Sequence, residues 1–205
     1  MHTQLGTLRR QRGFTLVEMV IVVIVLGILA IVAMNSLGNT QGNAQAKALF
    51  DAAQKTNNAW MVLRQAGGIP ADPTDANPAI QANNTALDVL MEGETFLETS
   101  YQSAYEAAGI APLSDMATIT TAPVAGTSAG AYEVNGFDYD MALSAGGDKM
   151  LYTLADVPTE IVKVMWEPNM TAAFDATADT TGTGDKIQHT TATGGVHDLT
   201  IALYI

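Results

Sequence analysis

The sequence contains no cysteine, and this absence removes several kinds of chemistry at once. Disulfide bonds, thiol nucleophiles and thiolate metal sites are excluded, so packing and hydrogen bonds must hold the folded part together. Basic residues are also scarce, with nine lysines and arginines against 21 acidic residues and a formal net charge of −12. Because an acidic surface repels phosphates, we expect no direct binding of nucleic acid.

Charge is almost absent from residues 15–34, where Glu18 is the only ionisable side chain. About 20 apolar residues at about 1.5 Å each match a hydrocarbon core of about 30 Å, which predicts a membrane-spanning helix. Three arginines lie just before this segment, and the next basic residue is Lys47. The positive-inside rule therefore predicts a cytoplasmic N-terminus and an extracytoplasmic remainder.

Glu18 is the unusual residue of this apolar segment. A charge at the centre of a bilayer costs roughly 2.5–3.5 kcal/mol, so an acid in such a helix indicates a functional role. One alternative is that Glu18 interacts only with the dipole at the N-terminus of its own helix. Another is that the segment is an ordinary cleaved secretory signal, although an acid so early in its apolar region argues against this.

Glu18 ends the string GFTLVE at residues 13–18, which leads into the apolar run. Over residues 9–34 the chain resembles the class III signal of type IV pilins and of type II secretion and competence pseudopilins. The resemblance implies that a prepilin peptidase cuts between Gly13 and Phe14 and methylates the new amino group of Phe14. It also implies that Glu18 meets the Phe14 amine of a neighbouring subunit during assembly.

The chain is expected to have three parts. Residues 1–13 form a leader peptide, residues 14–41 form a hydrophobic transmembrane and assembly helix, and residues 42–205 form an extracytoplasmic globular head. Apolar residues at three- and four-residue spacing predict that the helix continues to about residue 66, with Phe50 and Trp60 in the core. The predicted fold class is α+β and pilin-like, with this long N-terminal α-helix packed against a C-terminal antiparallel β-sheet.

Shorter elements are expected along the rest of the head. Two helices are predicted first, and then an exposed connection leads to four strands. The glycines at residues 146–147 predict a hairpin turn between the first two strands, and the strongly apolar last strand indicates a central position in the sheet. The predicted ranges are 85–91 and 94–108 for the helices, 118–130 for the connection, and 132–143, 150–154, 161–166 and 196–205 for the strands.

No constellation typical of catalysis emerges, so we expect that the chain is not an enzyme. His189 and His197 flank a threonine- and glycine-rich loop and are interpreted as polar loop residues, because their spacing fits no zinc pattern. The acids Asp175, Asp179 and Asp185 are weak candidates for calcium, which related pseudopilin heads bind. The loop has no EF-hand pattern, so solvated acids and no bound metal are the favoured interpretation.

The resemblance implies a structural subunit of a type IV pilus. The precursor would lie among the lipids of the bacterial inner membrane, and prepilin peptidase and the pilus assembly machinery would convert it to an extracellular fibre of identical copies. Two features depart from many pilins: no cysteine pair closes the C-terminal region, and Asn35 stands where proline is common. The alternatives are a pseudopilin of a type II secretion system or a minor pilin, and a membrane-tethered extracytoplasmic enzyme or binding protein.

Overall fold

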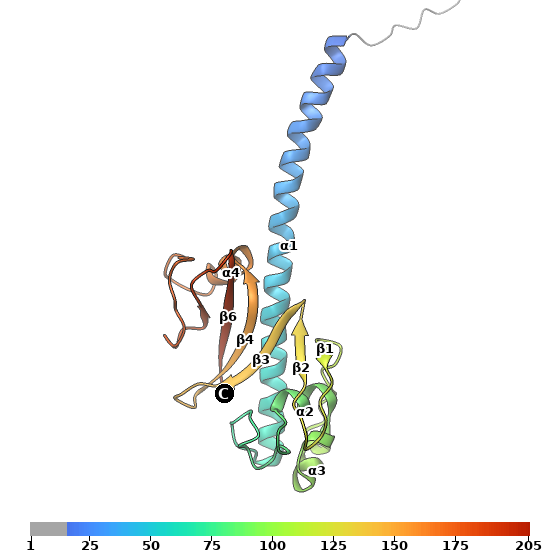
Figure 1. Cartoon of the computed structure of the whole chain (residues 1–205), viewed down its shortest axis with the longest axis vertical. Helices are drawn as coiled ribbons and strands as arrows, with labels where there is room; N and C mark the ends of the chain where they lie inside the picture. The colour runs from blue at the N-terminus through green and yellow to red at the C-terminus, as the bar shows by residue number, and fades with distance from the viewer. Residues whose placement is uncertain (1–15) are drawn as a thin grey trace, which may run out of the picture. The chain divides into compact units, whose positions relative to one another are not determined.

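A computed structural model describes residues 16–205, and Figure 1 shows the course of the chain. The chain divides into two compact units, one ending at Gln41 and the other covering Gly42–Ile205. Helix α1 (Leu16–Gly67) contributes residues to both units, and the other elements all belong to the second. These are α2 (Ala86–Glu92), the 3-10 helix η1 (Glu94–Phe96), α3 (Thr99–Ala108), β1 (Thr118–Thr121), β2 (Ala131–Val134), β3 (Phe137–Leu143), β4 (Lys149–Pro158), α4 (Thr159–Trp166), β5 (Ile187–His189) and β6 (Val196–Tyr204).

The six strands form one antiparallel sheet in the order β1-β2-β3-β4-β6-β5. Together with the helices, this sheet confirms the α+β class. The last strand, β6, lies between β4 and β5, so its predicted central position is also confirmed. The hairpin joining β3 to β4 turns at Gly147, whose φ of 73° is readily adopted by glycine, as the sequence predicted.

Two of the predicted strands are wrong. The range 132–143 is two strands, because Asn135 and Gly136 have φ values of 53° and 82° and form a tight turn between β2 and β3. An Asn-Gly pair is a strong hairpin signal, since both residues tolerate positive φ. The range 161–166 is helix α4, and its buried side chains recur at helical spacing. The short strands β1 and β5 were not predicted.

The helical part of α1 in the second unit packs against the sheet through an apolar face that contains Leu49, Trp60 and Leu63, all fully buried. Two polar residues of the same helix lie in this core. The Tyr139 hydroxyl donates to Thr56 Oγ1 at 3.1 Å, and the Tyr152 hydroxyl donates to Asn57 Oδ1 at 3.1 Å. Since buried polar groups must be paired, these bonds fix how far the helix is shifted along the sheet.

The head should lose stability in alkaline solution because of the same tyrosines. Burial raises the pKa of Tyr139 and of Tyr152 above the ordinary tyrosine value, and the Thr56 hydrogen bond only partly opposes this for Tyr139. Unfolded tyrosines lose their protons near pH 10, so above about pH 10 the unfolded state binds fewer protons and the free energy of unfolding falls. Urea unfolding at about pH 8 and about pH 11 measures the fall, which Tyr152→Phe should reduce.

A buried carboxylate holds the loop between β1 and β2 against α2. Asp88 is fully buried, and its Oδ1 accepts hydrogen bonds from the Tyr132 hydroxyl at 2.7 Å and the Gly130 N–H at 2.9 Å. Its Oδ2 accepts from the Thr85 N–H at 2.8 Å. Asn84 adds two bonds to the same loop, donating to the Ser128 carbonyl at 2.9 Å and accepting from the Gly126 N–H at 2.7 Å. These polar bonds link segments about 40 residues apart in a chain without disulfides.

Candidate functional site: the assembly segment and the surfaces of the head

The assembly segment predicted from the sequence is described only in part. Gly13 and Phe14 lie outside the described residues, and Glu18 falls in the first turn of α1, with its side chain outside the description. Large apolar side chains of this half of α1 are 48–58% exposed. They are Met19, Val22, Ile24, Val25 and Leu26.

Such exposure is unusual for five large apolar side chains within eight residues, and it indicates a helix that buries them against another apolar surface. The sequence also predicts that this segment spans the membrane. Nowhere in residues 16–205 is a helix found that is both long enough and apolar enough to cross a membrane.

The calcium candidates interact with their own neighbours in the chain. Asp175 accepts hydrogen bonds from the Thr177 N–H and hydroxyl at 2.9 and 2.7 Å, and Asp179 is bonded to Thr181 in the same way. These bonds hold the pKa of both carboxyl groups below the ordinary value. Within the described part of the chain, no three histidine or acidic side chains gather closely enough to hold a metal ion. Asp175, Asp179 and Asp185 stay weak candidates for calcium, and solvated acids stay the favoured interpretation.

The interpretation of the two histidines as polar loop residues is wrong. His189 lies in β5 and His197 in β6, and both are buried. Their ring centroids are 4.9 Å apart, and His189 also lies 5.1 Å from the rings of Trp166 and Phe174. Both Nδ1 atoms lie within 3.0 Å of the Thr190 carbonyl, so each donates to it. The histidines therefore anchor the segment before β6 to the core.

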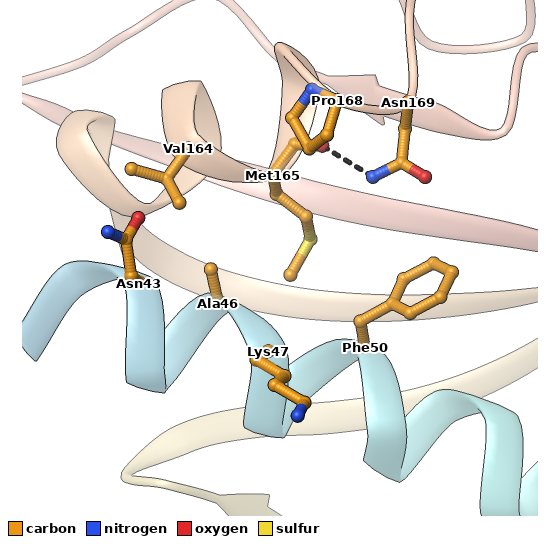
Figure 2. A pocket seen from close by; sticks show the side chains of 8 residues that line it. All are labelled: Asn43, Ala46, Lys47, Phe50, Val164, Met165, Pro168 and Asn169. Carbon is orange, nitrogen blue, oxygen red and sulfur yellow. Dashed lines mark hydrogen bonds between the residues drawn. The ribbon is translucent and has the colours of Figure 1, made fainter. Parts of the chain in front are cut away.

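One hollow of the head is lined by α1 and by α4 with the residues that follow it (Figure 2). It has a volume of about 260 Å³, and we call it the α1–α4 groove. Lys47 lies at its edge, and Lys186 reaches it from the loop before β5, with Nζ 4.5 Å from the centroid of the Phe50 ring. Lys186 also donates to Asn169 Oδ1 at 3.0 Å. The lining residues are Asn43, Ala46, Lys47, Phe50, Val164, Met165, Pro168 and Asn169.

Phe50 was expected in the core together with Trp60. Trp60 is fully buried, whereas Phe50 is half-buried and forms part of the floor of the groove (Figure 2). Ala46 and Ala53, one turn before and after Phe50 on α1, are buried, so Phe50 lies at the border between core and surface. The groove is therefore mainly apolar, and the amine of Lys47 points away from Met165 and Phe50 (Figure 2).

A second hollow, of about 400 Å³, is lined by residues of α2, the β1–β2 loop and strands β2 to β4. We call it the acidic hollow, because Asp138 and Asp140 are exposed beside each other on β3 and both line it. Glu133 of β2 lies directly opposite Asp138 in the antiparallel pair. Thr85, Leu87, Ala131 and Thr153 are among the other lining residues.

Comparison with known proteins identifies the first segment of the chain. Residues 8–34 match the family model of the prokaryotic N-terminal methylation motif, which is the class III signal of type IV pilins and pseudopilins. This match confirms the resemblance drawn from the sequence, and it covers Gly13, Phe14 and Glu18. Over residues 8–34 the chain is therefore similar to the pilins and pseudopilins. No curated protein and no solved structure matches the chain.

Proposed function

We propose that the chain is a structural subunit of a type IV pilus, made as a single-pass precursor in the bacterial inner membrane. The methylation motif at residues 8–34 carries this proposal. Prepilin peptidase cuts after Gly13 and methylates Phe14, and the assembly machinery of the inner membrane then polymerises copies of the chain into an extracellular fibre. The exposed apolar side chains from Met19 to Leu26 support a helix that is buried against its own copies.

The pairing of Glu18 with the Phe14 amine of the next subunit gives the polymer its register. Two opposite charges about 4 Å apart attract by about 4 kcal/mol at an effective dielectric constant of 20, before the cost of desolvation is subtracted. Desolvation makes the net gain small, but an unpaired charge among apolar helices is costly. A subunit that docks one position out of place leaves both charges unpaired, so misplaced subunits are rejected.

The N-terminus of the native protein tests the proposal directly. Removal of residues 1–13 from the 205 leaves 192, and mass spectrometry of protein from its own cells should show a chain that starts at N-methylated Phe14. The control is Gly13→Val, which should leave the leader attached, because a side chain at this position obstructs the approach of the backbone to a protease. Native protein that retains its arginine-rich leader would contradict the proposal.

A pseudopilin or a minor pilin has the same motif, and Asn35 in place of the common proline favours this alternative. Electron microscopy of cells that lack the protein separates the possibilities. Normal fibres would reject the main structural subunit and show that the chain is a minor subunit or part of a secretion system. A membrane-tethered enzyme or binding protein is the remaining alternative, and its activity would not depend on Glu18.

A further inference from the structure

We propose that the buried pair His189 and His197 makes the head sensitive to acid. When both rings carry a proton, the segment of residues 167–186 is released from the strands on which it packs. We call this segment the α4–β5 loop, because it connects α4 to β5. The change concerns the head alone, so it occurs in a single chain as well as in a polymer.

The α4–β5 loop packs on the histidine pair. Residues 167–186 contain no helix or strand. The centroid of the Phe174 ring lies 5.1 Å from that of His189 and 5.9 Å from that of His197. The Thr180 N–H donates to the His189 carbonyl at 2.9 Å. Because a segment without regular structure opens more easily than a core strand, the loop depends on these contacts.

The hydrogen bonds of the pair show where an added proton must bind. The Thr190 carbonyl can only accept, so it fixes a proton on Nδ1 of His189, at 3.0 Å, and on Nδ1 of His197, at 2.6 Å. In a neutral ring of this kind, Nε2 is an acceptor without a hydrogen. Acid therefore adds its proton at Nε2, and the two rings differ in the surroundings of this atom.

Only one of the two Nε2 atoms can keep a proton in the closed structure. Protonated His197 donates from Nε2 to Thr159 Oγ1, at 3.1 Å, and this hydroxyl donates in turn to the Gly195 carbonyl at 3.0 Å. His189 Nε2 is buried and has no hydrogen-bond partner among residues 16–205. A charge on His189 would also lie 4.9 Å from the charge on His197. An unpaired buried donor and repulsion between like charges both oppose the second proton until His189 reaches water.

The charged groups around the pair do not compensate for this second proton. Asp175 and Asp179 of the α4–β5 loop attract a charge on His189, but both are exposed, so water screens the attraction. The buried side chains of α4 are apolar or aromatic, and they are Ile161, Val162, Met165 and Trp166. The other charged side chains of the adjoining elements are exposed, and they are Asp156, Glu160, Lys163, Glu167, Asp185, Lys186 and Asp198.

Acid therefore favours the open loop. A histidine exposed to water binds a proton near pH 6.5. Below about this pH the open state holds more protons than the closed state, so the free energy that keeps the loop closed falls as the pH falls. The ladder between β3 and β4 includes neither histidine, so the opening is confined to one part of the head.

Hydrogen exchange of the full-length chain in detergent measures this opening. After correction for the intrinsic effect of pH on exchange, peptides that cover residues 167–186 should lose protection at least about tenfold between about pH 7.5 and about pH 5. Amides of the β3–β4 ladder are the internal reference and should keep their protection. Equal protection of the loop at the two pH values would overturn the proposal.

Substitution of His189 tests whether the histidine pair causes the response. His189→Phe keeps a ring beside Trp166 and Phe174 without a nitrogen that titrates, and it should hold the loop closed at both pH values. His189→Gln replaces the ring with a smaller neutral amide and should abolish the response as well. The matched control is His2→Gln, which replaces the only histidine outside the pair and should leave the response unchanged. Acid opening that persists in both His189 variants would overturn the role of the pair.

Proton NMR of the His2→Gln chain follows the two rings directly, with the pair itself unchanged. The His197 signal should titrate first, because its Nε2 has a hydrogen-bond partner in the closed structure. The His189 signal should titrate together with the loss of loop protection. Opening of the loop before His189 titrates would contradict the proposal.

Discussion

Replacing Asp88 with alanine is expected to lower the free energy of unfolding of the head by about 3–5 kcal/mol. The carboxylate is fully buried and accepts bonds from the Tyr132 hydroxyl, the Gly130 N–H and the Thr85 N–H, all within 2.9 Å. Alanine removes the acceptor but leaves the donors in place. The Tyr132 hydroxyl is buried and the Thr85 and Gly130 N–H groups are half-buried, and a buried donor without a partner costs about 1–3 kcal/mol, so the losses accumulate at one point of the head.

Urea unfolding of the full-length chain in detergent measures this effect. The two tryptophans, Trp60 and Trp166, are both buried in the head, so their fluorescence reports its unfolding. Tyr132→Phe is the matched control, because it removes one donor and leaves the carboxylate with its other partners, and it should cost only about 1 kcal/mol. A loss of less than about 1 kcal/mol for Asp88→Ala would show that the carboxylate does not hold the loop.

Glu18→Ala is expected to reduce the amount of assembled fibre at least about tenfold, while cleavage after Gly13 continues. The substitution leaves the Phe14 amine of the neighbouring subunit without a counter-charge, and a loss of about 1.4 kcal/mol per contact already changes an equilibrium tenfold. Fibres sheared from cells give the yield, and mass spectrometry of the cell-bound protein shows whether processing still occurs.

Two further substitutions at this position separate charge from size. Glu18→Gln keeps the shape of the side chain without its charge and should fail as alanine does. Glu18→Asp keeps the charge on a shorter side chain and should retain part of the yield. Normal fibres from Glu18→Gln would show that the acid does not pair with the amine of the neighbouring subunit.

Local patterns in the sequence predicted several parts of the fold correctly. The apolar run from residue 196 predicted β6 and its central place, and the glycine pair at 146–147 predicted the hairpin between β3 and β4. The range 161–166 was misread as a strand because a short apolar run fits a buried strand and a buried helix equally well. The spacing of its buried residues shows that it is a helix, but which residues are buried depends on the rest of the fold.

Among the candidate sites, some could be predicted from a local pattern in the sequence, and others are assembled only by the tertiary fold. The methylation motif is contiguous, so a single stretch of sequence contains all of its information. The α1–α4 groove joins Phe50 to Lys186, which only the tertiary fold brings to one place. The burial of His189 follows from its contacts with Trp166 and Phe174, which are distant in the sequence. Strand β5 is only three residues long, so no local pattern predicts that His189 is buried.

The hydrogen bonds of Asp88 and Asn84 to the loop between β1 and β2 have a consequence for how the head folds. A head closed by covalent sulfur bridges must wait for an oxidant and for an isomerase that corrects mispaired thiols. Here the closure consists of hydrogen bonds that form as the chain collapses, and no thiol is present to oxidise. Folding of this head is therefore independent of the redox state of the compartment in which it folds.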